Sequence, residues 1–218
     1  KFPITPFRPL AAGAMGSISR MYFDEATGTL YGAFRYQGVV EHVGALNTRD
    51  GTVRPLVDLQ GAMYYRVTSF AYDPGSGTAF YANHNYDLRD LMAVDVKTGE
   101  SRRLLKNARI GEIVFNPADR SLIGVRHEDG LATLVRIPYP YDDWRKIHTF
   151  PWEHVPTDLD VSPDGRLLSA SVNDHRGNQF LRVWRLDRLL DGDLEPIAEF
   201  SFGLSVPESF AFSKDGRY

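Results

Sequence analysis

The chain has 218 residues, of which 43% are hydrophobic and 24% are charged, a composition typical of a globular protein and not of a disordered one. Its formal net charge of −3 provides no basic stripe for nucleic-acid phosphates, and no apolar run is long enough to span a membrane. The absence of cysteine excludes disulfides, thiolate zinc sites and a cysteine nucleophile. We therefore expect no nucleic-acid partner and no transmembrane segment.

The first recurrent element begins near residue 20, and the same pattern returns four more times along the chain. Each copy joins a short apolar run to a turn rich in Asp, Asn, Ser, Pro or Gly, and then to a second apolar run. The copies read RMYFDEATGTLYGAF from residue 20, SFAYDPGSGTAFYAN from 69, EIVFNPADRSLIGVR from 112, DLDVSPDGRLLSASV from 158 and SFAFSKDGRY from 209. Their anchor residues, Phe23, Tyr72, Phe115, Val161 and Phe212, are 49, 43, 46 and 51 positions apart. A period of this length indicates one propeller blade per copy.

A second predicted hairpin follows each of the first four copies. These hairpins are VGALNTRDGTVRPLVDL from residue 43, LMAVDVKTGESRRLL from 91, ATLVRIPYPYDDWRKIHTF from 132 and FLRVWRLDRLLDGDLEPIAEF from 180. Two hairpins per unit make the four strands of a propeller blade. Only DRLLDGD, at 187–193, favours a helical turn, and the lack of long helical patterns between strands argues against an α/β fold.

The sequence thus predicts an all-β fold, a β-propeller with four complete four-stranded blades plus partial blades at both ends. We expect a single domain over residues 1–218, with repeat units at about 18–66, 67–109, 110–155 and 156–205 and partial blades at 1–17 and 206–218. The segment 7–10 resembles the predicted fourth strand at 53–56, which favours the outer strand of a preceding blade. Because a closed ring protects its sheet edges, we expect the chain to be part of a larger multidomain protein.

The SPDGR turn at 162–166 and its degenerate partners DPGSG, NPADR and SKDGR resemble the repeats of TolB-like and WD-like β-propellers. The resemblance covers nearly the whole chain, from about residue 7. It departs from true WD repeats, because no Gly-His pair is present and Val183-Trp184-Arg185 stands where Trp-Asp is expected. The resemblance implies a bacterial protein in a periplasmic or other extracytoplasmic location, while the residues themselves leave the compartment open. It implies no single activity, since these propellers include scaffolds, sensors and gates of peptidases.

Aligning the copies predicts which side chains surround one end of the central channel, because each inner strand starts, and each second strand ends, at the same face of a propeller. Two positions of each copy are expected at this end: the residue four before the first residue of the turn, and the residue eleven after it. The residues expected at this rim are Arg20, Arg35, His84, Glu112, His127, Asp158 and Asn173. Side chains of this kind suit a polar ligand, but one polar residue per blade also satisfies hydrogen bonds between blades.

The same rim offers a metal-binding alternative. Carboxylate and amide oxygens suit Ca²⁺, whereas histidine with carboxylate suits Zn²⁺, and either ion could polarise a carbonyl or activate water. No cofactor is required by the pattern, so a calcium or zinc ion at the channel mouth remains an alternative to a metal-free polar site.

An aromatic loop at 138–144, PYPYDDW, is the most distinctive connection in the sequence. Tyr139, Tyr141 and Trp144 could anchor a partner from an exposed hairpin tip, or pack over a neighbouring blade.

A serine hydrolase is not expected, because no G-x-S-x-G motif occurs and Ser76 lies in a predicted hairpin turn. We expect a non-catalytic propeller module that binds a protein, peptide or carbohydrate, or that gates a catalytic domain elsewhere in the parent chain. The alternative is a metal-dependent, lactonase-like hydrolase with its site at the channel mouth. Whether this segment is an enzyme is left open, with the pattern favouring a binding role.

Overall fold

We analysed a computed structural model of the chain, which describes residues 15–36, 42–58, 67–83, 89–205, 207 and 210–216. Sixteen strands and one short helix lie within these ranges. The predicted partial blade at 1–17 falls mostly outside them. The segment 210–216 is described and contains a turn at 214–215 but no strand.

The strands form four antiparallel four-stranded sheets, each consecutive in the chain. The first sheet contains β1 (Met15–Asp24), β2 (Thr29–Tyr36), β3 (His42–Asn47) and β4 (Val53–Asp58). The second contains β5 (Val67–Asp73), β6 (Thr78–Asn83), β7 (Asp90–Asp95) and β8 (Ser101–Leu105). The third contains β9 (Ile110–Phe115), β10 (Leu122–Glu128), β11 (Leu131–Ile137) and β12 (Arg145–Thr149). The fourth contains β13 (Pro156–Val161), β14 (Leu167–Asn173), β15 (Gln179–Arg185) and β16 (Ala198–Gly203), with α1 (Leu186–Leu190) between its last two strands.

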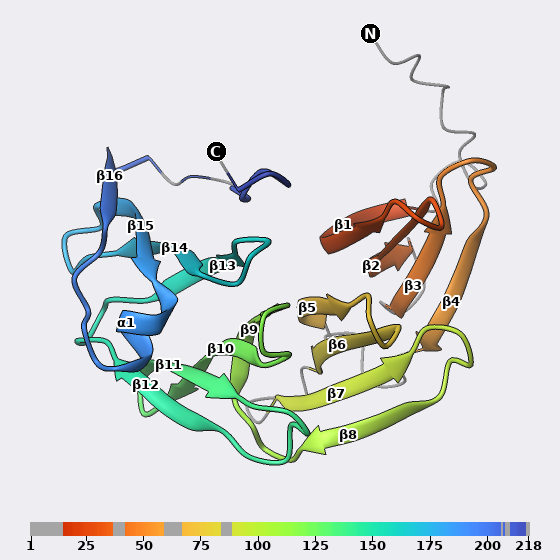
Figure 1. Ribbon diagram of the computed structural model, residues 1–218, viewed down its shortest axis with the longest axis horizontal. Helices are drawn as coiled ribbons and strands as arrows, with labels where there is room; N and C mark the ends of the chain where they lie inside the picture. Colours follow the sequence, from red (N-terminus) through yellow and green to blue (C-terminus); the bar gives the residue numbers. More distant parts are fainter. Residues whose placement is uncertain are drawn as a thin grey trace, which may run out of the picture.

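The four sheets are the blades of a β-propeller, numbered here blade 1 to blade 4 in chain order. They lie in an arc with β1, β5, β9 and β13 toward its centre and β4, β8 and β12 at its periphery (Figure 1). This confirms the predicted all-β propeller and its four complete blades. The predicted helical turn near 187–193 is also present, as α1.

Three hydrophobic cores hold neighbouring blades together. Tyr31 of blade 1 stacks on Tyr72 of blade 2 with ring centroids 4.7 Å apart, inside a core that both blades share. Phe80 of blade 2 packs with residues of blade 3, and Trp184 of blade 4 packs with residues of blade 3. Because a strand presents alternate side chains to opposite faces, each middle blade contributes to two cores.

The tight turn between the first two strands of each blade requires a left-handed residue at one position. Glycine occupies it at Gly28, Gly77 and Gly165, with φ between 67° and 71°. Blade 3 has Arg120 there instead, with a φ of 57°. Left-handed backbone costs a residue with a Cβ atom about 1 kcal/mol, so Arg120 must recover that free energy through its side chain.

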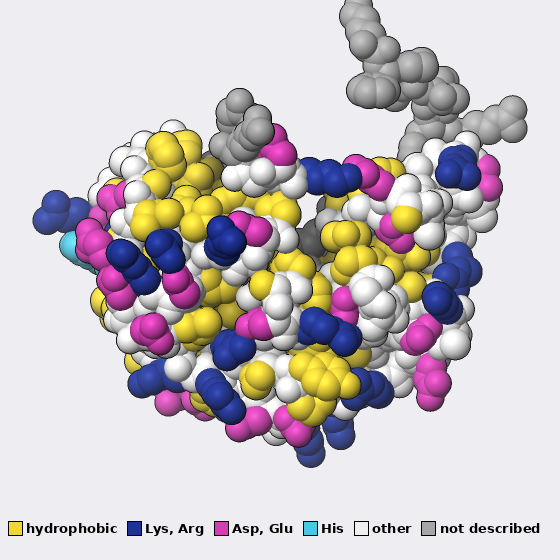
Figure 2. All heavy atoms as spheres, viewed as in Figure 1, with side chains coloured by type: hydrophobic (Ala, Val, Ile, Leu, Met, Phe, Trp, Pro, Cys, Tyr) yellow, Lys and Arg dark blue, Asp and Glu magenta, His cyan; other side chains and the backbone are white. Residues whose placement is uncertain are grey.

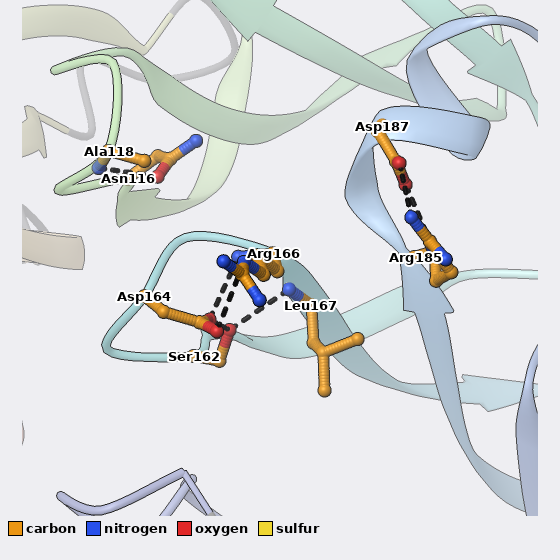
Figure 3. A network of polar contacts seen from close by, with 8 residues as sticks. All are labelled: Asn116, Ala118, Ser162, Asp164, Arg166, Leu167, Arg185 and Asp187. Carbon is orange, nitrogen blue, oxygen red and sulfur yellow. Dashed lines mark hydrogen bonds and ion pairs between the residues drawn. The ribbon is translucent and has the colours of Figure 1, made fainter.

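The SPDGR turn of blade 4 also abuts blade 3. Ser162 Oγ donates to Asp164 Oδ1 at 2.6 Å and accepts from the Leu167 amide at 2.9 Å, which fixes the turn (Figure 3). A Cβ atom on Gly165 would clash with Ala118 and Asn116 of the neighbouring turn. The motif that carries the family resemblance is therefore a structural feature of blade packing.

The outward faces of the end blades carry exposed apolar side chains. Met21 and Phe23 are exposed on β1, and Phe200, Phe202 and Leu204 are exposed on or just after β16. Figure 2 shows hydrophobic side chains gathered over the region of blade 4, at the upper left of the view. Within the described ranges, no helix is long and apolar enough to cross a membrane.

Candidate binding site at the rim

Strand register brings the predicted rim residues to one end of the blades. Glu112, near the start of β9, pairs with Val125, which lies two residues before His127 near the end of β10. In blade 4, Pro156 at the start of β13 pairs with Val172, next to Asn173 at the end of β14. We call this end of the blades the rim.

The best-defined part of the rim is a close contact between blades 2 and 3. Gly111 in β9 has no side chain, and the space that a Cβ atom would take is occupied by the guanidinium of Arg89 and the ring of His127. The His127 Cδ2 and Nε2 atoms would each lie 3.0 Å from such a Cβ. Arg89 precedes β7 of blade 2, so the contact depends on the absence of a side chain at 111.

This contact creates a positive local field. Burial of the ring, and then the charge of Arg89, lower the pKa of His127 below its ordinary value. His127 is thus neutral at pH 7. Within the described part of the chain, the Arg89 guanidinium makes no hydrogen bond or ion pair.

A second set of charges lies next to His127. Glu128 contacts Arg126, and its Oε1 atom lies 3.8 Å from Arg109 Nε. The hydrogen bond from Arg126 is the largest cause of a lowered pKa for Glu128. Arg126 also lies over the Trp144 ring, 4.7 Å from its centroid. Glu128 is therefore shared by two arginines and remains ionised.

Asn173 has a structural role in the observed fold. Its Oδ1 atom accepts from the Val155 amide at 3.1 Å, and its Nδ2 atom donates to the Glu153 carbonyl at 2.8 Å. These bonds fix the connection between β12 and β13, so both ends of the amide are engaged without a ligand.

Ser69 likewise illustrates the predicted hydrogen bonding between blades. It is buried in β5, and its hydroxyl accepts from the Ile113 amide of β9 at 2.6 Å. The position that the alignment predicted for ligand contact is thus used for blade packing in blade 2.

Of the remaining predicted rim residues, two have described side chains and three do not. Glu112 and Asp158 are partly buried and each engages in an interaction with its surroundings. Arg20 and Arg35 lie in β1 and β2, but their side chains are outside the described part, as is the whole of His84. Among the described residues, no three His, Asp or Glu side chains group closely enough to hold a metal ion.

The aromatic loop lies at the boundary between blades 2 and 3. Tyr141 is buried, donates its hydroxyl to the Arg120 carbonyl at 2.8 Å and packs edge-on against Phe80 of blade 2 at 4.8 Å. Trp144 is partly buried against the same core. Both therefore belong to the packing of blades 2 and 3, and of the three predicted partner-binding residues only Tyr139 presents an exposed ring.

Sequence reasoning missed Arg89 because its role depends on a contact with another blade. Gly111 was a usable signal, since a glycine inside a strand often marks a close approach of another group. The aligned copies have Ser19, Thr68 and Thr157 at that position.

A scan against protein families finds no match to the sequence, and a search of curated proteins finds none either. Solved structures, in contrast, match over most of the chain. TolB from Acinetobacter baumannii is 13% identical with a TM-score of 0.69, over 92% of this chain and 47% of that one. A putative TolB from Agrobacterium tumefaciens is 14% identical with a TM-score of 0.69, over 93% of this chain and 74% of that one.

An oligogalacturonate lyase in complex with manganese is 13% identical with a TM-score of 0.63, over 93% of this chain and 57% of that one. The chain thus spans about half the length of the first of these proteins, and at such low identity the likeness concerns the fold alone. In fold, this chain is a β-propeller similar to the TolB proteins, as the repeat pattern predicted.

Proposed function

We propose that this propeller is a non-catalytic binding module that receives a carboxylate-bearing segment of a protein, peptide or carbohydrate at the rim. The observation that carries the proposal is the pair of Arg89 and His127 around Gly111. A guanidinium without an acidic partner in the described structure attracts a carboxylate, and it binds that group bidentately more readily than a lysine would.

The pKa of His127 adds a pH dependence to this proposal. An anion bound beside the ring would stabilise the imidazolium, so the pKa of His127 rises when the ligand binds. Binding then takes up a proton, and affinity increases as the pH falls through the pKa of His127 in the bound protein toward its lower pKa in the free protein. A ligand bound elsewhere would not show this increase.

The experiment compares an acidic ligand with a neutral one. Trigalacturonate and a tetraglutamate peptide serve as anionic probes, and maltotriose serves as the neutral probe, with binding measured by calorimetry at pH 5.5 and pH 7.5. We expect Arg89→Gln to weaken binding of the anionic probes at least tenfold. Arg102→Gln is the matched control, because it removes the same charge from the exposed outer strand β8 of the same blade. If both variants weakened binding of the anionic probes equally, the effect would come from the net charge of the protein, and the proposed site would be contradicted.

A metal-dependent hydrolase or lyase is the second candidate, and its support is the likeness in fold to the manganese-bound lyase. Glu112, Asp158 and His127 carry groups that suit calcium or zinc, an ion that would polarise a carbonyl if bound, but these described side chains do not group closely enough to hold one. Against it, the charge of Arg89 beside His127 opposes binding of a cation there. A rise in melting temperature on adding Ca²⁺ or Zn²⁺, abolished by EDTA and by Glu112→Gln or Asp158→Asn, would favour this candidate over the first.

Three further parts of the proposal concern the parent protein. The exposed apolar faces of blades 1 and 4 suit additional blades that complete a ring, and such a ring could gate a catalytic domain in the same protein. A bacterial, extracytoplasmic location is part of the proposal, supported by the likeness in fold to the TolB proteins, and fractionation of cells that express the parent gene tests it.

A further inference from the structure

A cavity of about 260 Å³ lies between the outer parts of blades 3 and 4, separate from the rim. Its apolar wall comes from Leu134 in β11, Phe150 after β12, Trp184 in β15 and Leu189 in α1. None of these four is among the residues predicted at the rim. A fully apolar cavity of about 150 Å³ accepts a benzene ring, so this volume is sufficient for one aromatic or branched aliphatic side chain.

The wall is held in place by specific contacts. Trp184 donates its indole Nε1–H to the Leu194 carbonyl at 2.9 Å, which ties the β15 strand to the connection that follows α1. Leu189 and Trp184 are both buried in the core between blades 3 and 4. Blade 4 alone among the four described blades has a helix between its third and fourth strands, so the cavity depends on an element that its neighbours lack.

The polar part of the lining consists of Arg182 in β15 and two histidines, His148 and His154. Arg182 Nε donates to Glu199 at 2.7 Å, and the guanidinium lies 5.4 Å from the Phe180 ring centroid. Within the described residues, its two Nη groups make no hydrogen bond. His148 packs edge-on against Phe150 at 4.8 Å, and burial followed by the charge of Lys146 lowers the pKa of His148.

The charge balance of this lining favours a neutral acceptor over an anion. Arg182 is already paired with Glu199, and the Glu199 carboxylate would repel a ligand carboxylate bound beside Arg182. A peptide carbonyl carries no such penalty and can accept a hydrogen bond from the unused Nη groups. An apolar side chain attached to a peptide backbone satisfies both parts of the lining.

We propose that this cavity is a docking site for a hydrophobic side chain of a partner's peptide segment, whose backbone carbonyl accepts a hydrogen bond from Arg182. The site lies outside the rim and does not depend on the function proposed there. Its exposed border includes Leu194, Pro151 and, close by in the chain, Ile197, which suits continuation of the peptide over the surface.

The first test uses N-acetyl-L-phenylalanine N-methylamide as the probe and the indole N–H signals of the protein as the readout. The chain has three tryptophans, and Trp184→Phe identifies the signal that belongs to the cavity. We expect that signal alone to shift, with a Kd on the order of 1 mM for a single side chain. The free acid, N-acetyl-L-phenylalanine, should bind at least fivefold more weakly. Equal or tighter binding of the acid would overturn the neutral-acceptor assignment, and no shift of the Trp184 signal would overturn the site.

Two leucines of the same segment provide a matched pair of variants. Leu194 lines the cavity, whereas Leu190 in α1 does not, and both are more than a third exposed. Leu194→Phe fills part of the cavity and should raise the Kd of the methylamide probe at least fivefold. Leu190→Phe should leave that Kd unchanged. Arg89→Gln at the rim and its control Arg102→Gln in β8 should also leave this Kd unchanged, so failure here is distinguishable from failure of the rim proposal. Equal effects of the two leucine variants would contradict docking in the cavity.

Discussion

Individual residues in this propeller are constrained most strongly where two blades touch. Gly111 and Gly165 both occupy positions where a side chain would enter the space of the neighbouring blade. At Gly111 that space holds Arg89 of blade 2, with His127 of the glycine's own blade beside it, and at Gly165 it holds a turn of blade 3. Packing therefore requires the absence of a Cβ atom at both positions. At Gly165 the left-handed backbone conformation favours glycine as well.

The cost of close approach can be separated from the cost of left-handed backbone. Gly165 and Gly51 have similar φ values, 71° and 74°, but nothing lies within 4 Å of a Cβ atom on Gly51. We expect Gly51→Ala to lower the free energy of unfolding by about 1 kcal/mol, the conformational cost alone. Gly165→Ala should cost about 2 kcal/mol more, because the neighbouring turn must shift. Urea denaturation measures both, and equal losses would show that the contact with Ala118 is easily relieved.

The field at the rim gives a second prediction at the level of single residues. Arg89→Gln removes the positive charge beside His127, so the pKa of His127 should rise toward its ordinary value, while Arg102→Gln should leave it unchanged. Titration of the His127 ring signals by NMR measures the change. Since the pKa of His127 is lower in the folded than in the unfolded chain, stability conferred by the neutral ring is present above about pH 6.5 and is lost as the pH falls below it. Arg89→Gln should reduce that loss.

At the level of elements, turns connect the blades by charged contacts. Asp73 in the turn of blade 2 is buried, and its Oδ2 atom accepts from Arg120 Nη2 of blade 3 at 2.8 Å. Burial acts to raise the pKa of Asp73, but hydrogen bonds from Ser76, Arg120 and Gly75 outweigh it and lower the pKa below the ordinary value. This contact accounts for a non-glycine residue at the left-handed position 120.

Two substitutions at 120 test this account. Arg120→Ala loses the ion pair and keeps the left-handed backbone, so we expect it to lower the free energy of unfolding at pH 7. Arg120→Gly loses the same ion pair but relieves the backbone, so it should be about 1 kcal/mol more stable than the alanine variant. Thermal or urea unfolding would rank them, and the reverse ranking would contradict the role assigned to the side chain.

The pH dependence of this contact has a defined sign. The folded pKa of Asp73 is depressed, so the stability that it contributes is present above the ordinary carboxyl value near 4 and is lost as the pH falls through the folded pKa. The difference between the native protein and Arg120→Ala should therefore be constant near neutral pH and shrink in acid. A difference that persists at pH 2 would assign the effect to packing of the arginine stem.

In the whole molecule, the blades form a series in which each contacts its sequence neighbours through its own core. Such an arrangement resembles a stacked repeat, whose stability is a sum of unit and interface contributions. Within each blade, the second strand is buried between neighbours and the fourth strand is exposed. Most residues of the second strands β10 and β14 are buried, whereas most residues of the fourth strands β8 and β16 are exposed.

This contrast predicts a gradient of hydrogen exchange across every blade. We expect amides of β6, β10 and β14 to exchange slowest and those of β8, β12 and β16 to exchange fastest, because outer strands can open without disrupting the cores between blades. Exchange measured by NMR or mass spectrometry tests this order. Uniform protection within each blade would show that blades open as units, and the proposed independence of the outer strands would then be wrong.

Much of this architecture was predictable because it depends on local patterns. The spacing of Phe23, Tyr72, Phe115 and Val161 indicated the blades, and the composition of each turn predicted where strands reverse. Of the residues predicted at the rim, His127 lies in the cationic contact, whereas Asn173 bonds the backbone of the connection between β12 and β13. A register count identifies the end of a blade at which a side chain lies, but not the atoms that it meets there.

What the sequence by itself determined is the repeat, the strands and their order, since alternation and turn chemistry act between residues close in the chain. Only the tertiary structure decided that Arg89 meets His127 over Gly111, that Tyr141 is buried against Phe80, and that α1 closes a cavity beside Trp184. Each of these depends on how one blade packs on the next, and that packing is set by the combined shape of many side chains distant in sequence.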